Sequence, residues 1–155
     1  MSLFRQRLFP SVATAQPALA AFVLRVALGL VLLAHGLLKV LVFGLDGSSS
    51  FFGSVGLPPW LVYPVIALEV LGGLLIAAGL WVRPLAALSV VLLLGTVYVH
   101  APNGWLFSAA NGGWEYPLFL SVTALAVSLA GEGAYALRLP SSAGISASPS
   151  TSQAA

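Results

Sequence analysis

Apolar residues fill four long stretches of the chain, and shorter polar segments separate them. The stretches run from about Ala18 to Val42, Trp60 to Leu80, Pro84 to Val99 and Tyr116 to Ala130, the last extending toward Leu137. A helix needs about 20 apolar residues to cross a bilayer. The first two stretches meet this length, and the other two are shorter and open with a proline suited to a first helical turn. The pattern predicts an all-α integral membrane bundle of four transmembrane helices.

The segments between these stretches differ in character. Residues 44–57 are rich in Gly and Ser but contain Phe51 and Phe52, which predicts a loop with a short interfacial piece. Residues 80–83 form a tight connection, and residues 101–115 are rich in turn formers. We therefore expect residues 1–17 to be a cytoplasmic N-terminal segment, residues 18–137 the transmembrane domain, and residues 138–155 a disordered cytoplasmic tail, since Ser, Ala, Gly and Pro dominate from Pro140 onward.

Lys and Arg are unevenly distributed between the two sides of the predicted bundle. Four spans place both termini on one side, where Arg5, Arg7, Arg83 and Arg138 lie and Arg25 is nearest. The opposite loops, residues 44–59 and 101–115, contain no Lys or Arg. Because cytoplasmic loops carry the excess of these residues, both termini are predicted to be cytoplasmic.

Composition excludes several classes of protein. Hydrophobic residues make up 59% of the 155 positions and charged residues 6%, against about 25% charged residues in soluble domains. The net charge of +2 comes from scattered residues rather than a basic run, so we expect no nucleic-acid partner. The chain has no cysteine. It therefore cannot by itself supply disulfides, thiolate metal sites, iron–sulfur clusters or CxxC redox chemistry.

Three basic or titratable residues lie within the first apolar stretch. Arg25, His35 and Lys39 fall within an arc of about 80° at 100° per residue, so they share one helix face. Gly29 and Gly36 lie on or near this face and permit a neighbouring helix to approach closely. Charges within a span are costly and usually face the interior of a bundle. We predict an inward polar stripe; the alternative is that Arg25 and Lys39 extend toward opposite membrane surfaces.

Glu69 lies near the midpoint of the second stretch. A carboxylate there needs a partner, because an unpaired charge in an apolar interior is strongly destabilising. The candidate partners are Arg25, His35 and Lys39, and Gly72-Gly73 one turn away permits tight packing beside the carboxylate. An ion pair that only clamps two helices together, without chemistry, is an equally simple interpretation.

Several polar residues are predicted to lie in the half of the bundle that is farther from the cytoplasm, which we call the outer half. The first and third helices run outward and the fourth begins outside, so these residues could converge on one pocket: His35, Lys39, Glu69, His100, Asn103, Asn111 and Glu115, with Arg25 below it. We interpret His35, Glu69 and His100 as candidate catalytic residues that could relay protons at a quinone head group. Candidate ligand-binding residues are Arg25, Lys39, Asn103, Asn111 and Glu115. Glu115 would also suit the positive end of the fourth helix without any ligand.

Two other kinds of site are weaker interpretations. The two histidines and two carboxylates could hold a divalent cation, but their sequence spacing matches no known ligand pattern, so we assign no metal site. Axial haem ligation by His35 and His100 is disfavoured because the two residues lie at unequal depth.

The same residues carry a family resemblance. The runs that carry it are Arg25…Gly29…His35-Gly36…Lys39, Glu69…Gly72-Gly73, Gly79-Leu80…Arg83, His100…Asn103-Gly104 and Asn111-Gly112-Gly113-Trp114-Glu115. In order and spacing they resemble DoxX-family membrane proteins over about residues 22–137. The resemblance implies a bacterial inner-membrane protein of four helices. It also implies a membrane part of a quinol oxidase, a thiosulfate:quinone oxidoreductase, or an oxidative-stress or detoxification system. The lack of cysteine fits poorly with a self-contained sulfur enzyme.

Three functions stay open from the sequence, and with them whether the chain is an enzyme. The first is a quinone-linked redox subunit that works with a partner oxidoreductase subunit in the lipid bilayer. The second is a small transporter or channel whose path includes Arg25 and Glu69, for which four helices are few unless copies of the chain form a homo-oligomer. The third is a non-catalytic partner subunit whose polar stripe only holds the bundle together.

Overall fold

The computed structural model describes residues 16–137, and all regular structure in that range is helical. Arg5, Arg7 and Arg138, used above for orientation, lie outside these residues. The elements in chain order are α2 (Pro17–Leu41), α3 (Gly44–Ser54), η2 (Pro59–Leu61), α4 (Val62–Ala67), η3 (Leu68–Gly72), α5 (Gly73–Ala78), α6 (Val82–His100), η4 (Ala101–Asn103) and α7 (Glu115–Ala130). The all-helical prediction is confirmed.

Three continuous helical stretches are long and apolar enough to cross a membrane. They are Pro17–Leu41, Pro59–Ala78 and Val82–Asn103, with 25, 20 and 22 residues. The second is continuous through η2, α4, η3 and α5. Helix α7 is apolar but has 16 residues, fewer than the roughly 20 that a span perpendicular to the bilayer requires. These lengths support a multi-pass membrane protein.

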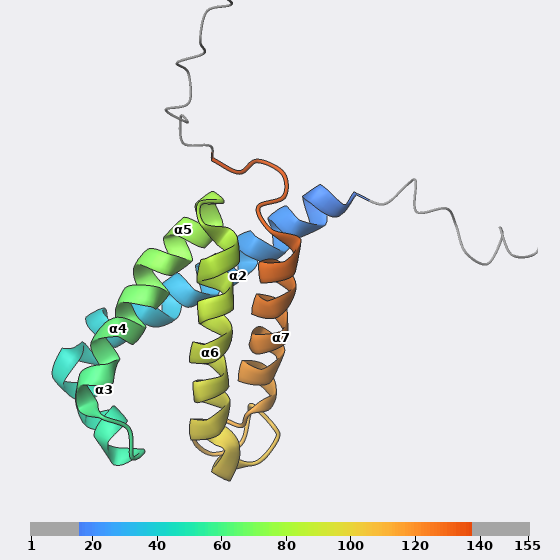
Figure 1. Ribbon diagram of the computed structural model, residues 1–155. Coiled ribbons are helices and arrows are strands. Elements are labelled where there is room, and N and C mark those ends of the chain that lie inside the picture. The colour runs from blue at the N-terminus through green and yellow to red at the C-terminus, as the bar shows by residue number, and fades with distance from the viewer. Residues whose placement is uncertain (1–15, 138–155) are drawn as a thin grey trace, which may run out of the picture.

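The helices form two antiparallel pairs (Figure 1). Helix α2 packs along the stretch from α4 to α5, and α6 packs along α7. Helix α2 crosses the α6–α7 pair obliquely and also contacts α7. The buried core runs between the pairs and contains Leu28, Leu32, Ile76, Val82, Ala86, Leu93, Leu120, Ala124 and Val127.

Two glycines let the α2 and α5 backbones touch. A methyl group added at Gly73 would lie 2.7 Å from the carbonyl oxygen of Gly29 and 2.9 Å from the amide nitrogen of Leu33. Both distances are shorter than any ordinary carbon contact, so no larger residue fits without separating the helices. The close approach that small residues permit in membrane bundles is therefore present between these helices.

Residues 44–57 contain more helix than the sequence predicted. Instead of a loop with a short interfacial piece, residues Gly44–Ser54 form helix α3. Gly and Ser favour helices weakly, but Phe52 and Ser48 are buried, with 8% and 5% of their surface exposed. The Ser48 hydroxyl also donates to the Lys39 carbonyl oxygen at 2.9 Å. Tertiary contacts therefore outweigh the local propensity.

The two ends of the bundle are closed differently. At one end, which we call the terminal end, residues 131–137 follow α7 and cross back to the neighbouring helices. The Ala134 amide donates to the Ala18 carbonyl at 2.7 Å, and the Leu137 amide donates to the Ala78 carbonyl at 3.0 Å. The opposite end, the loop end, carries residues 101–114, in which the rings of Trp105 and Trp114 meet edge to face at 4.5 Å.

Candidate functional site

An ion pair joins the last turn of α2 to the middle of the second long helix. The Lys39 ammonium lies 2.8 Å from both carboxylate oxygens of Glu69. The Glu69 side chain is 5% exposed and that of Lys39 is 21% exposed. Of the three partners that the sequence offered Glu69, the structure pairs it with Lys39. Both charges are thereby compensated in an apolar surrounding, as buried ions require.

The backbone that carries Glu69 departs from an ordinary α-helix. Residues Leu68–Gly72 form a π-helical turn, η3, with Gly73 following directly. Single π turns inside helices are rare and occur frequently at functional sites. The sequence analysis missed this turn. The available signal was a charged residue one turn before a Gly pair, which does not by itself specify a π turn.

Both histidines are tethered to backbone carbonyls by the same ring atom. His35 Nδ1 lies 2.8 Å from the carbonyl oxygen of Val31, and His100 Nδ1 lies 3.0 Å from that of Gly112. Because a carbonyl oxygen only accepts hydrogen bonds, the tautomer that satisfies both contacts carries its proton on Nδ1. Each neutral ring therefore offers Nε2 as an acceptor, and each protonated ring offers it as a donor.

These side chains border a cavity of about 270 Å³ between the two helix pairs. We call it the central cavity. It is lined by Val31, Leu32, His35 and Lys39 of α2, Glu69 of η3, Leu92, Leu93, Thr96 and His100 of α6, Tyr116, Pro117 and Leu120 of α7, and the loop residues Phe107, Gly112 and Gly113. The structure thus brings together four of the eight predicted site residues: His35, Lys39, Glu69 and His100.

Three further predicted residues organise the loop over this cavity. The Asn103 amide donates to the carbonyl oxygens of Asn111 and Gly112, at 3.1 and 2.8 Å. The Glu115 carboxylate accepts a hydrogen bond from the Phe107 amide at 2.9 Å. Gly112 and Phe107 line the central cavity, whereas Asn103, Asn111 and Glu115 do not. In this geometry these three residues position the cavity wall, and ligand contact by them stays a prediction.

Arg25 lies away from the central cavity, near the terminal end. It is fully buried, and its guanidinium donates to the carbonyl oxygens of Ile76, Ala77, Glu132 and Ala134. It also lies over the Phe22 ring, 5.1 Å from the centroid. Arg25 therefore joins α2 to the end of α5 and to the segment after α7, and its role in ligand binding stays a prediction.

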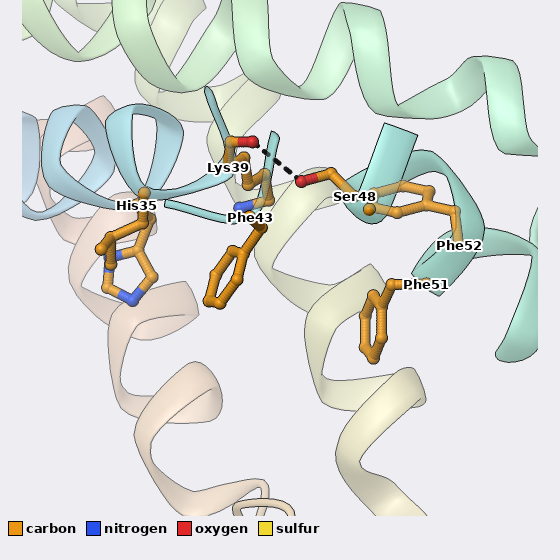
Figure 2. Close-up of a pocket in the computed structure, with 8 residues that line it drawn as sticks. His35, Lys39, Phe43, Ser48, Phe51 and Phe52 are labelled. Atoms are coloured by element: carbon orange, nitrogen blue, oxygen red, sulfur yellow. Dashed lines mark hydrogen bonds between the residues drawn. The ribbon is translucent and has the colours of Figure 1, made fainter. Parts of the chain in front are cut away.

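A second, larger cavity adjoins the first. This aromatic cleft, of about 490 Å³, lies between α2 and α3 and is lined by His35, Leu38, Lys39, Phe43, Gly47, Ser48, Phe51 and Phe52. His35 and Lys39 line both cavities. Figure 2 shows the side chains of His35, Phe43 and Phe51 projecting to the same side of helices α2 and α3.

Sequence reasoning also missed several residues that line the central cavity. Thr96 and Leu93 of α6 are cavity residues, as is Tyr116 of α7. A signal for the first two existed, because residues four and seven positions before His100 lie on the same helix face. Among residues 16–137, no three His, Asp or Glu side chains lie close enough together to hold a metal ion.

Comparisons with known proteins identify the family of the chain. The family model described as DoxX matches residues 20–102. A protein of Bacillus subtilis (strain 168) named "Putative oxidoreductase CatD" is 34% identical over 122 residues, which cover 77% of this chain and 84% of that protein. No solved structure matches the chain. The family match covers more than half of the chain, and the relative covers most of it. The chain therefore belongs to the DoxX family.

Proposed function

We propose that this protein is a membrane subunit of a quinone-linked oxidoreductase or of an oxidative-stress or detoxification system. In this proposal the central cavity holds a quinone head group or a similarly small polar ligand. One observation carries the proposal: an ion pair and two histidines from separate helices border a single cavity inside a predominantly apolar bundle. Titratable groups in membrane helices are costly and commonly mark a functional path or site.

The side chains present fit a quinone head group chemically. A bound quinone would supply two-electron, two-proton chemistry, and its oxygens accept hydrogen bonds when oxidised and donate them when reduced. The Lys39 ammonium donates to an oxygen in either state, and the Nε2 atoms of His35 and His100 accept or release a proton. The Glu69 carboxylate holds the Lys39 ammonium in place, with both carboxylate oxygens 2.8 Å from Nζ. Since the chain has no cysteine, a redox role needs a bound cofactor or the chemistry of a partner, and the proposal assigns the supply of electrons to a partner subunit.

The proposal includes an orientation in a bacterial inner membrane. Arg25, near the terminal end, and Arg83, at the start of α6, lie on the side to which we assign the cytoplasm. Residues 101–114 of the loop end carry no Lys or Arg, and Lys39 in the last turn of α2 is the Lys or Arg residue nearest to that end among residues 16–137. The charge asymmetry supports four spans with both termini cytoplasmic, in which α7 is the fourth and shortest. A bilayer locally thinned around α7 would accommodate its 16 residues. The oxidoreductase name of the Bacillus subtilis relative supports the redox assignment.

A transport path through the bundle has less support from the contacts. Such a path would use Arg25 below Glu69, but the Arg25 guanidinium donates to four backbone carbonyls and is fully buried. It lines neither the central cavity nor the aromatic cleft. Proteoliposome flux that depends on Glu69 would favour transport over the redox proposal.

Equilibrium binding tests the redox proposal directly. The purified protein, reconstituted in lipid nanodiscs, is titrated with a short-chain benzoquinone and with its reduced form. We expect binding that His35→Ala and Glu69→Gln each weaken by about tenfold, the loss of roughly one hydrogen bond to a charged or titrating group. Val91→Ala, at an exposed position of α6, is the control and leaves the affinity unchanged. Absence of binding by the native protein would refute the proposal.

A further inference from the structure

The aromatic cleft and the central cavity meet at a shared wall. His35 and Lys39 line both spaces, so a molecule that contacts these two side chains in the central cavity has the cleft directly beside it. The central cavity contains the polar groups of the site, and at about 270 Å³ it is the smaller space. The cleft, at about 490 Å³, has room for a substantial additional group.

Apart from the shared wall, the cleft offers almost no polar contact. Its remaining lining is Leu38, Phe43, Gly47, Ser48, Phe51 and Phe52, and the Ser48 hydroxyl is already engaged by the Lys39 carbonyl at 2.9 Å. Phe43 and Phe51 are 62% and 51% exposed, so the cleft opens onto an apolar outer surface of the chain. Whatever occupies it must therefore be apolar.

We propose that the aromatic cleft binds the hydrocarbon chain of an amphipathic ligand whose polar head lies in the central cavity. The same cleft is the route by which this ligand enters. This inference rests on the proposed function and adds to it the class of ligand: a membrane-borne molecule with a long apolar chain, admitted sideways between α2 and α3. Burying a chain in apolar protein gains little over lipid. The cleft is therefore expected to control access and chain fit more than affinity for the head group.

Gly47 provides a way to close the cleft without disturbing the fold. It lines the cleft, and a Cβ atom added there meets nothing within 4 Å. A Gly47→Phe side chain would therefore begin in open space at the lining of the cleft, where the ring has room to turn toward it, and helix propensity favours the replacement of Gly. Gly95→Phe is the matched control, since Gly95 also has open space around it and lines neither cavity.

The test compares two ligands with the same benzoquinone head, one without a chain and one with a decyl chain, in nanodiscs of fixed lipid content. We expect native protein and Gly95→Phe to bind both. Gly47→Phe should bind the decyl compound about tenfold more weakly, which is the effect of overpacking a site, while its affinity for the chainless compound stays the same. Expressing each affinity relative to native protein cancels the partitioning of the decyl chain into lipid.

Each other outcome overturns the inference. Equal loss for both compounds would mean that the cleft belongs to the head-group site, and no loss for either would mean that the chain lies elsewhere. If Gly47→Phe instead loses a co-purified phospholipid while binding both quinones normally, the cleft holds a lipid acyl chain. Failure of native protein to bind either compound would refute the proposed function itself, a result distinct from failure of the chain-length comparison.

Discussion

The Lys39–Glu69 pair allows a quantitative test of whether two charges hold the bundle together at this point. Replacing Lys39 with Met keeps a long flexible side chain but removes the ammonium, and leaves a carboxylate whose side chain is 5% exposed. Glu69→Gln removes the opposite charge but keeps an oxygen that can accept from Lys39, whose side chain is 21% exposed. The two single variants and the double variant form a thermodynamic cycle.

The magnitudes follow from burial and distance. At 2.8 Å and an effective dielectric constant of about 20, the attraction is about 6 kcal/mol before the cost of desolvation is subtracted. Leaving a buried charge without its partner costs about 3–5 kcal/mol, so we expect this loss in the free energy of unfolding for Lys39→Met. Glu69→Gln should cost less, about 1–3 kcal/mol, because the remaining charge is more exposed and retains a hydrogen bond. The double variant has no buried charge and should recover about 1–3 kcal/mol relative to the sum of the singles.

Unfolding in mixed micelles measures these differences. Far-UV circular dichroism, followed as sodium dodecyl sulfate is added to protein in mild detergent, reports the loss of helix for each variant. Val40→Met places the same side chain one residue away at an exposed position and should change stability by no more than about 0.5 kcal/mol. The reasoning is wrong if Lys39→Met and Val40→Met have the same free energy of unfolding. It is also wrong if the loss in the double variant equals the sum of the losses in Lys39→Met and Glu69→Gln.

Three further predictions concern packing and the closure of the two ends. Gly73→Ala should be about 1–3 kcal/mol less stable than Gly95→Ala, because only the methyl group at position 73 meets the α2 backbone, at 2.7–2.9 Å. Both variants gain helix propensity, so equal unfolding midpoints would contradict this prediction. Arg25→Leu should lose about 3–5 kcal/mol and expose residues 131–137 to limited proteolysis, whereas Val91→Ala, at an exposed position of α6, should leave the cleavage rate unchanged. Asn103→Ala should cost about 1 kcal/mol and speed amide hydrogen exchange in residues 104–114, where its two carbonyl partners lie; unchanged exchange would show that these bonds do not order the loop.

Helix positions were the most predictable feature of the fold. The first apolar stretch, 18–42, corresponds to Pro17–Leu41, and the fourth, 116–130, corresponds to Glu115–Ala130. The third helix begins at Val82, two residues before the predicted proline. These agreements arise because long apolar runs bounded by Pro, Gly and Asn leave few alternatives in lipid, where every backbone group must be bonded within its own helix.

The features that the sequence did not reveal depend on contacts between distant residues. Helix α3 is stabilised by burial of Phe52 and by the hydrogen bond from the Ser48 hydroxyl to the Lys39 carbonyl oxygen. A Gly- and Ser-rich segment indicates neither contact. Helical geometry placed Arg25, His35 and Lys39 within an arc of about 80°, but an angle does not say which neighbour each side chain meets. Glu69 pairs with Lys39 from within the π turn at η3, a rare feature that the apolar pattern did not predict.

The two charged residues of α2 show why polarity inside a membrane helix does not by itself identify a site. Arg25 is fixed by four backbone carbonyls and lines neither the central cavity nor the aromatic cleft. A ligand could reach it only by displacing bonds that hold α2, α5 and the segment after α7 together. Lys39 is also compensated, but by a single side chain, and it borders both cavities. A ligand oxygen can therefore share the Lys39 ammonium with Glu69 without dismantling the fold. This difference in how each charge is satisfied places the candidate chemistry at the Lys39–Glu69 pair.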